Sequence, residues 1–255
     1  MTKDELLRTA YHVDPQDIDN EPFGPLRPRR VEELLERVHI RHAAPLTVER
    51  PPVLRIGVIC RNYAVLLASM LRQQGTPARA RVGFGGYFQP VYAVDHRITE
   101  YWHEAQQRWV RVDAMIDEVQ RRHRRLTCEA LDIGPDTPFW LAGEVWQRCR
   151  AGKCDPQDFG DSDVDQGMPP IRYALLHDFA YLNTCEVPGC DDWGELISKP
   201  EAKLTGADLA LLDRIAELTT DVDTHFDEIR QIFTESTYGQ AVREHLAIHG
   251  LGQGR

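Results

Sequence analysis

The stretch Gly57–Gly75, GVICRNYAVLLASMLRQQG, constrains the fold of this chain more than any other. After Cys60, apolar or small residues recur at the i, i+3, i+4, i+7 spacing of a helix with one face in the core. They are Tyr63, Ala64, Leu67, Ala68 and Leu71, and Val65, Leu66 and Met70 widen the stripe. Gly75 and Pro77 form a stop signal, because glycine accepts the left-handed conformation and proline cannot extend a helix. The pattern predicts a helix from Cys60 that is buried on most sides.

Cys60 falls in the first turn of this predicted helix. Unpaired backbone N–H groups and the helix dipole favour negative charge at that end. A thiol placed there loses its proton more easily, and the thiolate is the nucleophilic form of cysteine. From this stretch alone, the alternative interpretation is a buried helix that begins with a small apolar cysteine.

Two runs farther along the chain predict a β-hairpin. Residues 96–103 and 108–113 are rich in aromatic and β-branched residues, and the link between them has hairpin length. One register gives both an aromatic pair and an opposite-charge pair across the strands. That register pairs Trp102 with Trp109, Glu100 with Arg111, and Ile98 with Asp113.

The same hairpin places a histidine beside a carboxylate. Because side chains alternate between the two faces of a strand, His96 shares a face with Asp113 in this register. The two residues lie diagonally across the strands, about 7–8 Å apart at the backbone and within side-chain reach. The sequence therefore predicts a histidine–aspartate neighbour pair without reference to any known protein.

A thiol at a helix start, an imidazole and a carboxylate together can perform acyl transfer. The thiolate attacks an acyl carbon, and the histidine holds the thiolate and then protonates the leaving group. The aspartate orients the imidazole, and backbone N–H groups around Cys60 would stabilise the oxyanion. The product is a thioester that water hydrolyses or an amine intercepts.

Three blocks in this order resemble the transglutaminase-like superfamily of cysteine enzymes: GVICRNYAVLLASMLRQQGTPARARVGF, DHRITEYW and RWVRVDA. The resemblance implies that Cys60 is the nucleophile, His96 the base and acid, and Asp113 the orienting carboxylate. It also implies a papain-like α+β fold, in which the nucleophile helix packs on an antiparallel sheet. The later blocks LAGEVWQRCRAG, DPQDFG and DDWG are similar to a bacterial subgroup of this superfamily.

Two positions depart from the pattern of the superfamily. Gly57 stands three residues before Cys60, whereas members commonly keep this glycine nearer the nucleophile. Arg97 follows the histidine where many members have an aromatic pair, so the resemblance implies no particular acyl donor. Tyr63 and Trp102 are the candidate substrate-binding residues, and packing in the core is the alternative for both.

Charge and hydropathy limit the classes of partner and the cellular compartment that we expect. A net charge of −10 argues against nucleic acid, since such a surface repels phosphates. No apolar run approaches the roughly 20 residues needed to cross a bilayer, and the start MTKDELLRTA lacks the pattern of a secretory signal. We expect a cytoplasmic protein that takes a small-molecule or peptide substrate and requires no cofactor.

Six cysteines in a reducing compartment are expected to be free thiols. Four of them form two pairs with four intervening residues, which is the outer edge of zinc-ligand spacing. The pairs are Cys149 with Cys154 and Cys185 with Cys190. A four-cysteine zinc site is the alternative to free thiols, and we expect no metal.

The remaining segments predict mainly helices. Expected helices cover Lys3–Tyr11, Val31–Val38, Phe139–Arg150, Ile171–Leu182 and a segment from Thr205 to Leu218 that Thr205 and Asp208 open as a capping box. Ala78–Phe84 is an expected strand, and Asp155–Gly167 an expected acidic, solvated loop. The organisation is a single domain with an N-terminal helical layer (1–52), a catalytic core (53–120) and a mainly helical C-terminal extension (121–255).

The leading functional hypothesis is a cysteine enzyme that acts on an amide, peptide or thioester by hydrolysis or acyl transfer. A second hypothesis is a non-catalytic binding module that keeps the same fold. A third is a coenzyme A-dependent acyltransferase in the manner of arylamine N-acetyltransferases, for which the basic run Arg121–Arg125 is the sequence support.

Overall fold

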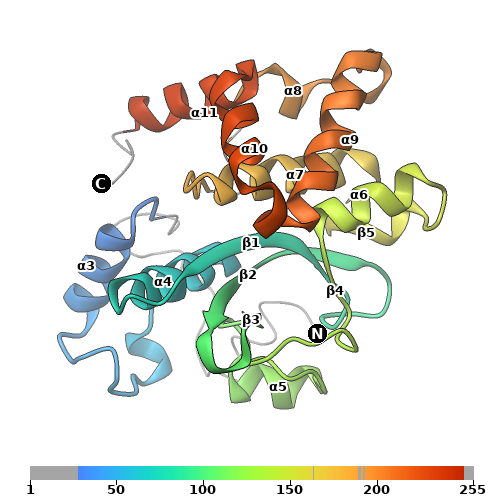
Figure 1. The fold of residues 1–255 in the computed structure, drawn as a ribbon. Helices are drawn as coiled ribbons and strands as arrows, with labels where there is room; N and C mark the ends of the chain where they lie inside the picture. The colour runs from blue at the N-terminus through green and yellow to red at the C-terminus, as the bar shows by residue number, and fades with distance from the viewer. Residues whose placement is uncertain (1–27, 163, 189–190, 192, 250–255) are drawn as a thin grey trace.

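The computed structural model describes residues 28–162, 164–188, 191 and 193–249. They form a mixed α+β fold in which most helices gather on one side of a curved sheet and α5 lies on the other (Figure 1). The helices are α3 (Val31–Arg41), α4 (Cys60–Gln73), α5 (Glu118–Arg124), α6 (Ala142–Arg150), α7 (Met168–Leu182), α8 (Glu195–Ser198), α9 (Gly206–Thr220), α10 (Val222–Glu235) and α11 (Thr237–Ile248). The strands are β1 (Ala78–Gly85), β2 (Ala93–His103), β3 (Arg108–Val112), β4 (Phe139–Leu141), β5 (Phe159–Ser162) and β6 (Asp165–Gln166).

The sheet has the order β4-β1-β2-β5-β6, and β3 also pairs with β2. β2 runs antiparallel to β1 on one edge and to β3 on the other, whereas β5 runs parallel to β2. The hairpin of β2 and β3 has the predicted register, with Glu100 opposite Arg111 and Trp102 opposite Trp109. These two cross-strand pairs confirm the register that was predicted from side-chain chemistry.

One edge of β2 carries a gap in the sheet. Along this edge β5 pairs with Ala93 and Val94, and β3 pairs with β2 only from Thr99 onward. Residues 95–98 therefore have no partner strand on this edge within the described residues. β3 ends at Val112, and the N–H of Asp113 donates to Ala130 O at 2.8 Å. The predicted pairing of Ile98 with Asp113 is therefore not part of the ladder, because the chain turns away one residue earlier.

The predicted helix at Cys60 is present as α4. It runs to Gln73, and Gly75 has the left-handed φ of 82° that the stop signal requires. Ala64, Val65 and Ala68 are buried against the sheet. The expectation of burial on most sides was wrong at Met70, which is 41% exposed, and Tyr63 is 37% exposed.

Two polar residues occupy part of the buried face of α4 instead. Arg61 and Asn62 are buried because backbone carbonyls satisfy their N–H groups. The Arg61 guanidinium donates to Pro28 O at 2.9 Å, to Arg29 O at 2.7 Å and to Glu186 O at 3.1 Å. These bonds tie the segment before α3 and the segment after α7 to the first turn of α4.

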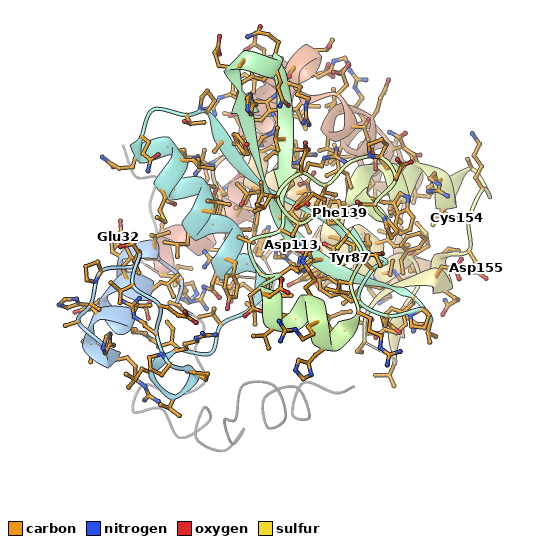
Figure 2. The ribbon with its side chains drawn as sticks, turned by 90° about the horizontal axis from the view of Figure 1, so that it is seen from below. Glu32, Tyr87, Asp113, Phe139, Cys154 and Asp155 are labelled. Atoms are coloured by element: carbon orange, nitrogen blue, oxygen red, sulfur yellow. The ribbon has the colours of Figure 1, made fainter. Side chains whose placement is uncertain are left out.

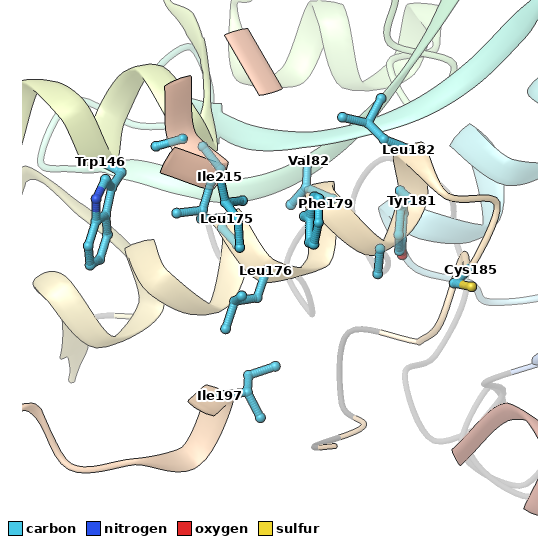
Figure 3. Packing of buried hydrophobic residues seen from close by; sticks show 14 of the residues in the cluster. Val82, Trp146, Leu175, Leu176, Phe179, Tyr181, Leu182, Cys185, Ile197 and Ile215 are labelled. Carbon is cyan, nitrogen blue, oxygen red and sulfur yellow. The ribbon is translucent and has the colours of Figure 1, made fainter. Parts of the chain in front are cut away.

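The core centres on α7, whose apolar side chains are buried along most of its length (Figure 3). A buried ion pair joins this helix to the sheet: Arg81 Nε and Nη2 donate to the two oxygens of Asp178 at 3.0 and 2.8 Å. The N–H of Val82 donates to the same carboxylate at 2.7 Å. A charge inside the core is tolerated here because both of its oxygens are paired.

Beyond residue 120 the structure corrects two predictions. Phe139–Arg150 is not one helix, because residues 139–141 form β4 and only Ala142–Arg150 is helical. β4 pairs with β1 beside Gly83, where a Cβ atom would stand 2.2 Å from Trp140 O. Asp155–Gly167 is not simply a loop, because it contains a 3₁₀ turn (Pro156–Asp158), β5 and β6.

Other expected elements appear within a few residues of their predicted ends, as α3, β1 and α7. The capping box of α9 is present, with the N–H of Thr205 donating to Asp208 Oδ2 at 2.7 Å. The predicted helix Lys3–Tyr11 lies outside the described residues. Strands from residues 53–120 and from the extension after residue 120 share one sheet. Within the described part of the chain, no helix has both the length and the apolar character needed to span a bilayer.

Candidate active site

Cys60 is the first residue of α4 and is partly exposed. Two reciprocal bonds fix the first turn: the N–H of Ile59 donates to Asn62 Oδ1 at 3.3 Å, and the N–H of Asn62 donates to Ile59 O at 2.9 Å. The sulfur therefore sits at the positive end of a helix whose entry angle is fixed.

His96 and Asp113 form a buried pair at the gap in the sheet. His96 Nε2 lies 2.8 Å from Asp113 Oδ2, and both side chains are almost inaccessible to solvent. The other carboxylate oxygen accepts the N–H of Met115 at 3.0 Å. Since Nε2 faces the carboxylate, Nδ1 is the ring nitrogen left for an interaction with Cys60, whose sulfur acts on the pKa of His96.

The charges of the three groups reinforce one another. Burial raises the pKa of Cys60, but His96 and, to a smaller extent, Arg97 more than offset it, so the pKa lies below the ordinary value. Burial lowers the pKa of His96, whereas Asp113 and Cys60 raise it, to about 10. Burial also opposes the ionised form of Asp113, but His96 keeps its pKa low. Each group therefore favours the charged form of its neighbour: the thiolate, the imidazolium and the carboxylate.

Two aromatic residues that the sequence did not single out complete this cluster. The Tyr87 hydroxyl donates to Asp113 Oδ2 at 2.7 Å, and Figure 2 shows the two residues side by side above α5. The ring of Phe88 packs edge-on against the His96 ring, with centroids 4.7 Å apart. Both residues follow Gly83, Gly85 and Gly86 at the end of β1, where the chain turns toward β2. These glycines are typical of a turn, but they do not indicate that Tyr87 and Phe88 contact the site.

The two predicted substrate-binding residues lie in different places. Tyr63 is one helical turn beyond Cys60, with its ring partly exposed and the charges of Asp117 and Arg55 acting on it. Trp102 is six residues beyond His96, about 20 Å along the strand. Its indole packs against Trp109 at 5.8 Å. The structure thus brings Tyr63, but not Trp102, to the cysteine.

The basic run Arg121–Arg125 forms the second half of α5 and its cap. Arg121 donates to Cys128 O at 2.7 Å and lies 3.9 Å from Glu118. Arg122 is largely exposed and lies 3.8 Å from the same glutamate. These contacts are those of a solvated helix end.

The described cysteines of the alternative zinc site are not brought together. Cys149 and Cys154 lie with their sulfurs 3.1 Å apart, and Cys149 lines a pocket with Met168, the first residue of α7. Cys185 follows the other end of α7, a helix of 15 residues and therefore about 22 Å long (Figure 3). Cys190 lies outside the described residues. A tetrahedral site needs its ligands within a few ångströms, so these three sulfurs cannot share one ion.

A different group in the described residues has metal-ligand chemistry. Single ligand atoms of Asp191, His245 and His249 all lie within 4.8 Å of one another. The Asp191 carboxylate, however, already accepts hydrogen bonds from Arg29 and from His245, whose Nε2 is 2.7 Å away. A cation would have to displace the arginine. This group does not include Cys60, His96 or Asp113.

A helical layer on a mixed sheet, with a thiol at a helix start facing a histidine–aspartate pair, is the architecture of papain-like cysteine proteins. Residues 50–114 match the family model of the transglutaminase-like superfamily, so this segment is similar to the core of that superfamily. The match covers about a quarter of the chain and includes Cys60, His96 and Asp113. No curated protein and no solved structure gives a significant match.

Proposed function

We propose that this protein is a cysteine-dependent enzyme that forms a thioester acyl-enzyme on Cys60 from an amide, peptide or thioester substrate. Water or an amine then receives the acyl group. The observation that carries the proposal is the 2.8 Å contact of His96 with Asp113, beside the Cys60 sulfur at the start of α4, which acts on the same imidazole. The match of residues 50–114 to the model of a superfamily that generally uses cysteine chemistry supports the same proposal.

The proposed reaction begins with the Cys60 thiolate attacking the acyl carbon. The S–C bond forms as the carbonyl π electrons move to oxygen, and N–H groups of the first turn of α4 stabilise this oxyanion. The imidazolium of His96 then gives its proton to the departing amine or thiol as the C–N or C–S bond breaks. In the second half, neutral His96 takes a proton from the incoming water or amine, and the thiolate leaves.

Asp113 and Tyr87 have supporting roles in this scheme. Asp113 holds the imidazole in one orientation and stabilises its positive charge. Burial and the adjacent carboxylate raise the pKa of Tyr87, so its hydroxyl stays protonated and serves as a donor to Asp113. The carboxylate is thereby fixed from two directions.

The decisive experiment is intact mass spectrometry after incubation with a panel of amide, peptide and thioester donors. We expect one acyl group to add to the wild-type protein and none to add to Cys60→Ala. Cys154→Ala is the matched control, because it removes another partly exposed thiol away from the site, and it should acylate normally.

Acylation that persists in Cys60→Ala would refute the assignment of the nucleophile. A ligand that binds wild type and Cys60→Ser equally, with no covalent adduct from any donor, would favour a binding module instead.

A further inference from the structure

We propose that Arg97 is a positioning residue of this site, which acts through Cys60 by supplying a second, permanent positive charge beside the sulfur. The proposal rests on Cys60 being the nucleophile of the proposed function. It goes beyond the Cys60–His96–Asp113 set, in which His96 alone provides positive charge.

The packing of α4 on β2 brings Arg97 level with Cys60. The Thr99 hydroxyl donates to Ala64 O at 2.9 Å, which fixes one point of contact between strand and helix. Two residues back along the strand, about 6–7 Å, the same face carries Arg97. Four residues back along the helix, about 6 Å, stands Cys60. The step from Thr99 to Arg97 and the step from Ala64 to Cys60 run in the same direction. This follows because Cys60 also lies near His96, which precedes Thr99 on the strand as Arg97 does.

The Arg97 guanidinium is buried and only partly used. Its side chain is 5% exposed, and Nη1 pairs with Asp95 Oδ2. Nε and Nη2 have no hydrogen-bond partner among the described residues, and neither does the second oxygen of Asp95. Buried N–H donors of a cation normally find an acceptor, so two free ones point to a negative group that is not always present.

The groups that face Arg97 from the neighbouring helix do not neutralise it. On α7, His177 is fully buried, and burial together with the charges of Arg97 and Arg61 keeps its pKa well below the ordinary value, so it is neutral. Burial likewise raises the pKa of Tyr181, which is also neutral. The remaining negative groups near Arg97 are Asp95 and the sulfur of Cys60.

Three neighbouring residues of β2 therefore place charges near the Cys60 sulfur, two positive and one negative. His96 and Arg97 favour the thiolate, and Asp95 opposes it more weakly than Arg97 favours it. Unlike His96, Arg97 does not titrate in the working range, so its support persists when the imidazole loses its proton. In the second half of the proposed reaction, the same charge stabilises the thiolate as the bond between sulfur and the acyl carbon breaks.

The test is the pH profile of alkylation of Cys60 by iodoacetamide, followed by peptide mapping, which requires no turnover. We expect Arg97→Gln to raise the midpoint of the profile by about one pH unit and Arg97→Lys to restore most of that shift. Asp95→Asn should move the midpoint the opposite way, to lower pH. A disturbance of packing alone would not move the midpoint in opposite directions in Arg97→Gln and Asp95→Asn.

Arg172→Gln is the matched control, because it removes another buried arginine that donates to the carbonyl of Lys199, and it should leave the midpoint unchanged. If Arg97→Gln is poorly folded, the double variant Asp95→Asn/Arg97→Gln removes both charges as a pair and should still raise the midpoint. A midpoint that stays at the wild-type value in Arg97→Gln and in the double variant overturns the proposal. Wild-type labelling spread evenly over all cysteines would instead refute the proposed function.

Discussion

Tyr87 and Asp113 are joined by a 2.7 Å hydrogen bond across 26 residues of sequence, on the same carboxylate oxygen that faces His96. The tyrosine comes from the turn between β1 and β2, whereas the aspartate follows β3. The bond therefore joins the turn between β1 and β2 to the residue that follows β3, and the His96 imidazole lies beside both residues.

Replacing Tyr87 with phenylalanine removes this donor and keeps the ring. We expect acyl-enzyme formation to slow by about tenfold, because a hydrogen bond to a charged acceptor contributes about 1.5–3 kcal/mol and its loss frees the carboxylate to move. Stopped-flow or quenched-flow measurement of acylation gives the rate. Tyr101→Phe is the matched control and should keep the wild-type rate; a normal rate in Tyr87→Phe would exclude the tyrosine from a supporting role.

In the proposed reaction, we expect the imidazolium of His96 to set the upper pH limit. Burial alone would lower the pKa of His96, but Asp113 and Cys60 raise it to about 10, so the ion pair is lost only as the pH rises through that value. In Asp113→Asn the carboxylate charge is gone, and the falling limb of single-turnover acylation should move toward the ordinary histidine value of 6.5. Asp132→Asn, at an exposed pair with Arg108, should keep the wild-type profile. An unmoved limb in Asp113→Asn would contradict the assigned role of the aspartate.

Glu100 is a buried carboxylate held by three arginines. Arg79, Arg81 and Arg111 contact it at 2.8, 2.9 and 2.9 Å. Burial opposes ionisation, but these charges keep the pKa of Glu100 well below its usual range. A lowered folded-state pKa gives stability that is complete above the unfolded value of 4.5 and is lost as the pH falls below it.

Glu100→Gln should therefore lower the free energy of unfolding at pH 7 by about 3–5 kcal/mol, since it leaves buried arginines uncompensated. Its stability should also fall less steeply than that of the wild type below about pH 4.5. Urea denaturation at several pH values measures both effects. Glu235→Gln, on the exposed face of α10, should change neither quantity, and equal acid sensitivity of Glu100→Gln and wild type would count against the ion cluster.

Gly83 allows β4 to lie against β1. An added Cβ would meet Trp140 O at 2.2 Å and the Phe139 ring at 2.8 Å, so Gly83→Ala must push the strands apart. We expect a loss of about 1–3 kcal/mol in the free energy of unfolding, as for other overpacked sites. Gly134→Ala, where nothing lies within 4 Å, should be nearly neutral. Equal stability of the two variants in thermal melts would show that the strands are free to separate here.

The elements that could be predicted from the sequence are those whose determinants are local. The register of β2 and β3 follows from pairs such as Trp102 with Trp109, which a short link brings face to face. The start and end of α4 follow from Cys60 and Gly75. The hairpin placed His96 beside Asp113, whereas the family resemblance was needed to bring Cys60 to this pair.

The missed elements depend on distant partners. β5 pairs with only two residues of β2, and its sequence is acidic and glycine-containing, so no periodicity marks it as a strand. Tyr87 meets Asp113 only because a turn after the glycines happens to end there. The burial of Arg61 was missed because backbone carbonyls from residues 28, 29 and 186 provide acceptors that the local pattern does not show.

The buried pair of Arg81 with Asp178 has a consequence for engineering the family-matched segment. Residues 50–114 contain Arg81 and one of its counterions, Glu100, but Asp178, which accepts from Nε and Nη2 of the same guanidinium, lies on α7. A chimera that transplants only this segment into a new host would leave these two N–H groups of Arg81 without their carboxylate in the middle of the sheet. The smallest unit that can be grafted as a working module must therefore include the helix from Met168 to Leu182.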